Sequence, residues 1–131
     1  MILVIGGAFQ GKYTFASEEL GIKDGWADGD FCRFHEIYEC RAIHHFHDYV
    51  KRALKDHYDL SKLVPNLLEK NPDICILTNE MGYGVVPTDA FERELRDRLG
   101  SICIELAENS DVVYRMICGI PTIIKEKADR T

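Results

Sequence analysis

A glycine-rich segment near the start of the sequence has the residue types that bind phosphate groups. Gly6, Gly11 and Lys12 fit the pattern G-x-x-x-x-G-K. Glycines let backbone N–H groups turn toward phosphate oxygens, the lysine adds a positive charge, and the helix expected next directs its positive end to the same place. The alternative is a tight turn without a ligand. We predict that nucleotide phosphates are bound by Gly6, Gly7, Ala8, Phe9, Gln10, Gly11, Lys12, Tyr13 and Thr14.

Tyr13 stands where this type of loop carries serine or threonine. The hydroxyl at that position ligates Mg²⁺, whereas the tyrosine hydroxyl lies at the far end of a rigid ring. Thr14 has the right chemistry, but one helical step turns it roughly 100° away. The sequence therefore favours nucleotide binding over magnesium-dependent phosphoryl transfer.

A second polar segment follows the apolar run at 73–78. Asn79 and Glu80 come directly after this expected strand, at the carboxyl end where parallel sheets bind ligands. Gly82 and Gly84 would let the loop approach a ligand closely. We predict that Asn79 contacts the nucleotide and that Glu80 is catalytic. The alternative is a structural turn in which Glu80 caps backbone N–H groups.

Three histidines, His44, His45 and His47, lie in a segment expected to be helical. A nucleophilic histidine would need one exposed ring nitrogen and a second group that orients the other nitrogen. A metal site would need a third ligand, for which Glu39, Cys40 and Asp48 are the candidates. Polar surface or packing histidines are the third interpretation. We assign no metal site.

Strand and helix patterns alternate along the chain. The expected strands are 2–5, 73–78 and 112–118, which are short, solid apolar runs. The expected helices are 12–20, 42–55, 60–68 and 89–109, the last capped by Asp89. Residues 21–30 are expected to form a loop, and 31–38 fit either a strand or a helix. This alternation predicts one α/β domain over 1–131 with a mostly parallel sheet and right-handed crossovers.

Composition excludes several classes of function. Sixteen lysines and arginines against 22 acidic residues leave a net charge of −6, which argues against nucleic acid as a partner. No apolar run approaches the roughly 18 residues of a membrane span. The five cysteines are scattered without a C-x-x-C pair, and the first residues lack the pattern of a secretory signal. We expect reduced thiols in a cytoplasmic protein.

Two stretches together resemble a known family. They are Ile2-Leu3-Val4-Ile5-Gly6-Gly7-Ala8 with Gly11-Lys12, and Thr78-Asn79-Glu80-Met81-Gly82-Tyr83-Gly84-Val85-Val86-Pro87. Both are similar to the bifunctional adenosylcobinamide kinase/adenosylcobinamide-phosphate guanylyltransferases of cobalamin synthesis. The resemblance implies a small three-layer sandwich of the P-loop type, ATP or GTP with Mg²⁺, a corrinoid (adenosylcobinamide) substrate and a homo-oligomer.

The middle of the chain is shorter than in that family, which leaves two alignments. In the favoured one, Glu39 and Cys40 match the family's Glu-Cys pair, and the helix with the guanylylated histidine is deleted between Gly21 and Phe31. In the other, His44-His45 matches the guanylylated histidine. The resemblance implies that Glu39 or Glu80 acts as a base or Mg²⁺ ligand, and that His44 or His45 carries any covalent guanylyl group. A nucleotide-binding or regulatory module that has lost catalysis is the alternative function.

Overall fold

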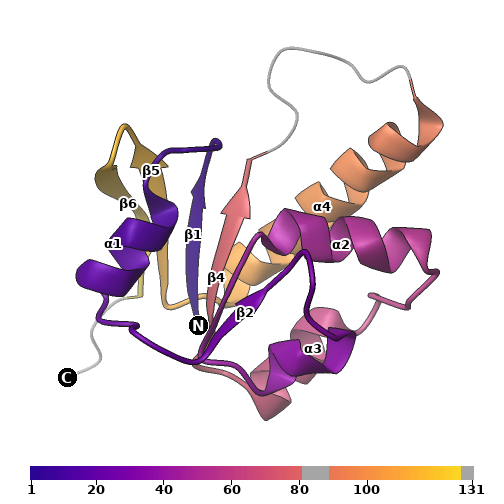
Figure 1. Ribbon diagram of the computed structural model, residues 1–131, viewed down its shortest axis with the longest axis horizontal. Helices are drawn as coiled ribbons and strands as arrows, with labels where there is room; N and C mark the ends of the chain where they lie inside the picture. Colours follow the sequence, from indigo (N-terminus) through magenta and orange to yellow (C-terminus); the bar gives the residue numbers. More distant parts are fainter. Residues whose placement is uncertain (81–88, 128–131) are drawn as a thin grey trace.

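A single mixed sheet organises the molecule, for which a computed structural model describes residues 1–80 and 89–127. In spatial order the strands are β2 (Trp26–Asp28), β3 (Ala42–His44), β4 (Cys75–Asn79), β1 (Ile2–Gly6), β5 (Val112–Ile117) and β6 (Ile120–Glu126). The first five are parallel, and β6 pairs antiparallel with β5 (Figure 1). The predicted mostly parallel sheet is confirmed.

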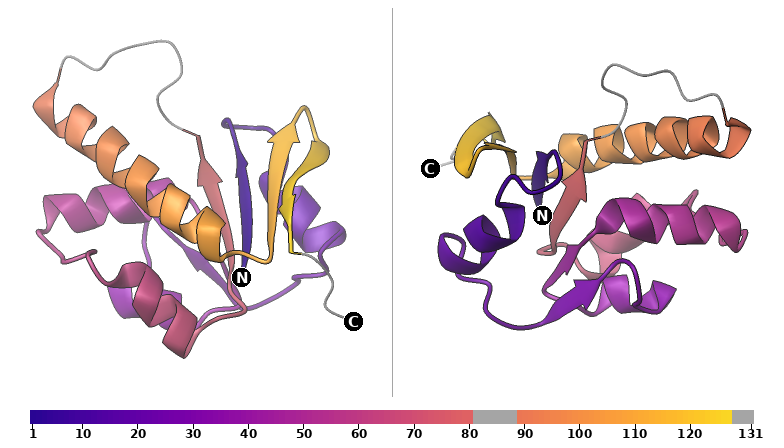
Figure 2. Two further views of the ribbon diagram at one scale, coloured as in Figure 1. Left: turned by 180° about the vertical axis from the view of Figure 1, so that it is seen from behind. Right: turned by 45° about the horizontal axis from the view of Figure 1, so that its top comes forward.

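Helices cover both faces of this sheet. They are α1 (Lys12–Glu18), the 3₁₀ helix η1 (Phe34–Tyr38), α2 (Phe46–Lys55), α3 (Leu63–Lys70) and α4 (Ala90–Asn109). On one face Phe15 of α1 packs with Val4 and Leu77. The larger core lies on the opposite face, under α2, α3 and α4 (Figure 2). This arrangement confirms the expected small three-layer α/β sandwich of the P-loop type.

The central strands were predictable because they are buried on both faces. Every residue from Cys75 to Thr78 in β4 is at most 1% exposed, as is typical of a parallel strand covered by helices on each side. The expected runs at 2–5, 73–78 and 112–118 therefore correspond to β1, β4 and β5.

The expected helix over 42–55 is wrong at its start. Residues Ala42–His44 form β3, His45 adopts a left-handed conformation with φ of 55°, and α2 begins only at Phe46. Ile43 and Phe46 are both fully buried in the same core, so their spacing mimics a helix although a strand end and a turn separate them. The three histidines consequently do not share one helix.

Two further strands were not expected. The segment 21–30 contains β2, an edge strand of three residues that pairs with β3. Beyond 112–118, Cys118 and Gly119 have positive φ angles of 50° and 77° and turn the chain back into β6. Both strands lie at sheet edges, where partial exposure removes the solid apolar pattern of a buried strand.

The remaining elements agree with the sequence or resolve its ambiguity. The ambiguous segment 31–38 contains η1, and the pattern at 60–68 becomes a helix from Leu63 onward. Asp89 caps α4 by accepting hydrogen bonds from the N–H groups of Phe91 at 2.7 Å and Glu92 at 3.3 Å. Within the described ranges, no helix combines the length and apolar character needed to cross a membrane.

Candidate functional site

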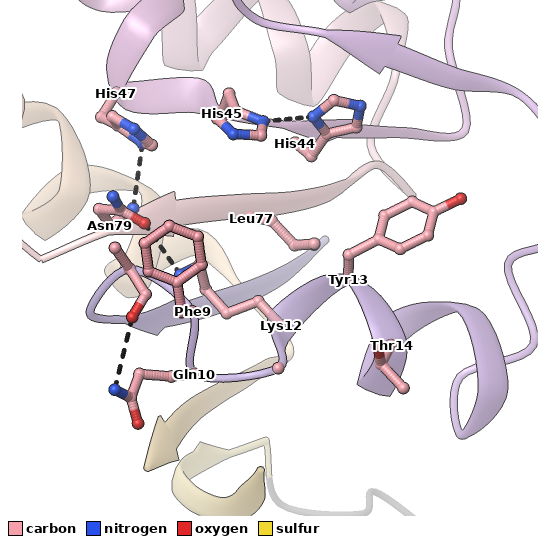
Figure 3. Close-up of a pocket in the computed structure, with 12 residues that line it drawn as sticks. Phe9, Gln10, Lys12, Tyr13, Thr14, His44, His45, His47, Leu77 and Asn79 are labelled. Atoms are coloured by element: carbon pink, nitrogen blue, oxygen red, sulfur yellow. Dashed lines mark hydrogen bonds between the residues drawn. The ribbon is translucent and has the colours of Figure 1, made fainter. Parts of the chain in front are cut away.

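An open pocket of about 310 Å³ lies where β1, β3 and β4 end. Its lining residues are Ala8, Phe9, Gln10, Gly11, Lys12, Tyr13, Thr14, His44, His45, His47, Leu77 and Asn79. Figure 3 shows that the loop after β1 forms one side and the histidines after β3 form the other. Three sequence segments that are far apart in the chain thus meet at the carboxyl edge of the sheet, as expected for an open α/β ligand site.

The loop after β1 offers unpaired backbone donors. Gly11 has a φ of 86°, a conformation that favours glycine, and it immediately precedes α1. Among the described residues, none accepts a hydrogen bond from the backbone N–H groups of Ala8, Phe9, Gly11 or Lys12. Backbone N–H groups require acceptors, so this loop is chemically suited to an anion.

Lys12 extends from the loop into the pocket. Its Nζ donates to Asn79 Oδ1 at 2.9 Å and to the Gly7 carbonyl at 2.7 Å. Burial lowers the pKa of Lys12, and the nearby Glu80 carboxylate acts in the opposite direction. The lysine is therefore held at the strand ends by acceptors that a phosphate oxygen would replace.

Gln10 lines the pocket and is also hydrogen-bonded to the turn between β5 and β6. Its Oε1 accepts a hydrogen bond from the Cys118 N–H at 2.6 Å, and its carbonyl accepts from the Gly119 N–H at 3.1 Å. These bonds fasten the loop to the β5–β6 turn. Phe9, by contrast, is fully exposed with a φ of 60°, at the open side of the pocket.

The position after Lys12 does not supply a hydroxyl to the pocket. The Tyr13 ring centroid lies 4.8 Å from that of Trp26 and 5.9 Å from that of His44. Figure 3 shows the Tyr13 hydroxyl directed away from Lys12. Because Glu80 is also occupied by an ion pair with Arg115, the described donors do not fit the P-loop Mg²⁺ site that the resemblance implies.

The histidines form two separate contacts (Figure 3). His44 Nδ1 and His45 Nδ1 lie 2.5 Å apart and share a hydrogen bond. His47 Nδ1 accepts from the backbone N–H of Asn79 at 3.2 Å, while its Nε2 lies 3.1 Å from Asp48. His47 therefore ties the start of α2 to the end of β4. His44 and His45 each keep an Nε2 atom that this pairing does not use.

The two predicted catalytic carboxylates do not join these histidines. Glu80 is held by Arg115 through Nε–Oε1 at 2.9 Å and Nη2–Oε2 at 3.2 Å, and both side chains line a neighbouring cavity with Gly6 and Cys118. Glu39 is exposed and precedes β3, at the opposite end of the strand from His44. The structure thus brings together Lys12, Asn79, His44 and His45 but leaves Glu39 apart.

Sequence reasoning missed two residues around the site and the contact made by a third. Arg115 pairs with Glu80, and Asp28 lies beside His44 because β2 and β3 are in register at these two residues. His47 was a candidate together with the other histidines, but its hydrogen bond from the backbone N–H of Asn79 was not expected. Asp28 belongs to the turn-rich segment 21–30, which suggested only a loop. Gly82 and Gly84, named with Asn79 and Glu80, lie outside the described residues.

Comparison with known proteins gives one family match and one curated relative. The family described as cobinamide kinase/cobinamide phosphate guanyltransferase matches residues 41–124, well over half of the chain. The bifunctional adenosylcobalamin biosynthesis protein CobU of Salmonella typhimurium is 30% identical over 76 residues, which are 58% of this chain and 41% of that protein. The aligned part thus spans less than half of the relative. The family match begins after Cys40, so it contains the histidines and Asn79 but not the loop with Lys12.

Proposed function

This chain belongs to the cobinamide kinase/cobinamide phosphate guanyltransferase family, and we propose that it binds the phosphates of ATP or GTP in the pocket around Lys12. The observation that carries this proposal is the placement of the Lys12 ammonium in one pocket with Asn79, His44 and His45. The loop supplies N–H donors, and Lys12 supplies the charge that phosphate oxygens need.

The chemistry we propose is guanylyl or phosphoryl transfer to a cobinamide substrate in cobalamin synthesis. In guanylyl transfer, the free Nε2 of His44 or His45 would attack the α-phosphorus of GTP and release diphosphate. The partner imidazole, hydrogen-bonded through Nδ1, would hold the attacking ring in place. Mg²⁺ would come with the nucleotide, held by phosphate oxygens and water rather than by residue 13.

A nucleotide-binding module without catalysis is the second candidate. It is favoured by Tyr13, whose ring packs on Trp26 where a catalytic loop would present a hydroxyl, and by Glu80, which Arg115 already neutralises. In this case the chain would bind nucleotide as a regulatory signal. Both candidates share the same phosphate site.

Location and assembly also belong to this proposal. All five cysteines are free, which supports the reducing environment of the cytoplasm. We propose one domain over 1–131 that associates with further copies of itself, as the family resemblance implies.

Thermal unfolding with ATP, GTP and GDP, each with and without Mg²⁺, tests the phosphate site. A ligand at about 100 times its dissociation constant adds roughly 2.7 kcal/mol, so the midpoint should rise by several degrees. The rise should vanish in Lys12→Ala and persist in Lys62→Ala, a control that replaces an exposed lysine before α3. No rise with any nucleotide would refute the proposal.

Covalent labelling separates the two candidates. If the chain is a guanylyltransferase, GTP labelled at the α-phosphate should leave acid-labile label on the protein. Loss of that label in either His44→Gln or His45→Gln, but not in His57→Gln, would identify the nucleophile. Nucleotide-dependent stabilisation without label or product would support the module that lacks catalysis.

A further inference from the structure

Two strand ends and a turn bring three potential metal ligands together beside the pocket. Asp28 at the end of β2 and His44 at the end of β3 are register partners, with His44 Nδ1 3.9 Å from Asp28 Oδ1. His45 follows directly and places its Nδ1 2.5 Å from that of His44 (Figure 3). One ligand atom from each of the three residues lies within 4.8 Å of the other two.

The backbone around these residues is tightly constrained. The Gly29 N–H donates to the His44 carbonyl at 2.9 Å, and a Cβ at Gly29 would overlap the His45 carbonyl oxygen. His45 itself adopts a φ of 55°, which a residue other than glycine rarely takes. Such conformations persist where the surrounding structure holds them, and they concentrate at functional sites.

The carboxylate is also oriented. Asp28 Oδ1 accepts a hydrogen bond from the backbone N–H of Asp30 at 2.9 Å, which fixes the side chain and leaves its second oxygen available. Metal ligands are commonly positioned in this way by a further hydrogen bond. Asp28 and His44 are half-buried, so the cluster is partly shielded from water while His45 remains exposed.

We propose that Asp28, His44 and His45 bind one divalent transition-metal ion of the zinc class. Two imidazole nitrogens and one carboxylate oxygen form a donor set that suits zinc, whereas Mg²⁺ and Ca²⁺ prefer oxygen ligands alone. Three protein ligands leave a fourth position for water or a ligand oxygen. His44 and His45 line the pocket, so that position is expected to face it.

A second group of possible ligands shares His45 but fits zinc less well. It consists of Asp30, His45 and Asp48, with a single nitrogen donor. Asp48 is also in contact with His47 Nε2 at 3.1 Å. The Asp28 group is therefore preferred, and substitution of Asp48 tests the choice.

The metal site does not depend on Lys12 but competes with covalent catalysis. A bound ion would take the Nδ1 lone pairs of both His44 and His45 and break the hydrogen bond between the rings. The rings would then be ligands rather than nucleophiles. Lys12 takes no part, so Lys12→Ala should bind zinc as the wild type does.

Calorimetric titration with zinc chloride on chelator-treated protein without a histidine tag tests this site. All variants carry Cys118→Ser, because the Cys118 thiol is exposed and free thiols bind zinc. The protein with Cys118→Ser alone is the parent. We expect saturable binding of one zinc ion per chain, weakened by more than about tenfold in Asp28→Asn and in His45→Gln. His35→Gln, an exposed histidine on η1, is the matched control and should bind as the parent does.

Three outcomes would overturn the proposal. The first is that the parent shows no saturable zinc binding. The second is that Asp28→Asn binds zinc as tightly as the parent. The third is that Asp48→Asn weakens zinc binding while Asp28→Asn does not. Circular dichroism checks that each variant is folded, and His44→Gln replaces His45→Gln if the latter unfolds. Substitution with Co²⁺ gives a second readout, since its visible absorption should appear in the parent and disappear in the ligand variants.

Discussion

Lys12 links the electrostatics of the pocket to its expected ligand. Burial lowers the pKa of Lys12 below its ordinary value of 10.5, while Glu80 opposes that effect. The ammonium is therefore lost at a lower pH than in an ordinary lysine. A bound phosphate would favour the charged form, so binding should take up a proton at alkaline pH.

We predict that nucleotide affinity falls as the pH rises through the lowered pKa of Lys12. The fall should approach about tenfold per pH unit at most, because a single proton is involved. Calorimetric titration with ATP across alkaline pH would measure it. In Lys12→Arg the guanidinium keeps its charge, so the curve should be flat. Parallel curves for the two proteins would show that another group titrates.

Replacement of Tyr13 by serine should restore a dependence on Mg²⁺. The serine hydroxyl would stand next to Lys12, where P-loops hold the ion. We predict that Mg²⁺ strengthens nucleotide binding several-fold in Tyr13→Ser and leaves the wild type nearly unchanged. The control is Tyr13→Ala, which gains no hydroxyl. Like Tyr13→Ser, it removes the ring contact with Trp26, which contributes about 0.5 to 1.5 kcal/mol. A gain of Mg²⁺ dependence in Tyr13→Ala as well would contradict this explanation.

Site residues that belong to one continuous motif could be predicted from the sequence. Those that meet only because strands lie side by side could not. Gly11 and Lys12 belong to one short motif, and the structure places them in the pocket. Asp28 meets His44 only because two short strands pair in register, and nothing in the sequence near Asp28 indicates that partner. Arg115 of β5 reaches Glu80, just beyond the end of β4, across the intervening strand β1, a contact that the sequence does not indicate either.

Among the elements, the turn that follows β2 packs against the backbone of the two histidines that line the pocket. Gly29 lies against the His44–His45 peptide, where a methyl group has no room. We predict that Gly29→Ala lowers the free energy of unfolding by about 1 to 3 kcal/mol, as for other overpacked positions. Urea denaturation would measure the change.

Gly100 provides the matched control on α4. A Cβ at Gly100 meets no atom within 4 Å, so Gly100→Ala should raise the stability of the helix by up to about 1 kcal/mol. If Gly29→Ala were as stable as the wild type, this result would contradict the close approach of Gly29 to the His45 carbonyl oxygen. The geometry of the proposed metal ligands would then be wrong as well.

Edge elements explain most of the differences between prediction and structure. Strands β1 and β4 are nearly continuous apolar runs, which only buried parallel strands require. Strands β2 and β6 lie at the edges, and the start of β3 shares its apolar spacing with α2. The spacing of apolar residues indicates that one face of an element is buried. It does not indicate where one element ends and the next begins.

At the scale of the whole molecule, β6 presents an exposed apolar edge. Ile120, Ile123 and Ile124 are 67%, 50% and 54% exposed, on a strand that pairs with β5 on one side. Within the described residues no strand covers its other side. Exposed apolar edge strands are favourable sites for association with another chain. We therefore expect the homo-oligomer to form through β6.

Charged residues on β6 should dissociate that oligomer. We predict that Ile120→Lys combined with Ile123→Lys yields monomers in sedimentation velocity, because lysines on an edge strand oppose pairing with a second copy. Ile104→Lys places the same charge on an isoleucine of α4 that is 64% exposed, and it should sediment as the wild type does. A monomeric wild type would refute the oligomer itself. An oligomer that survives the double substitution would place the interface elsewhere on the molecule.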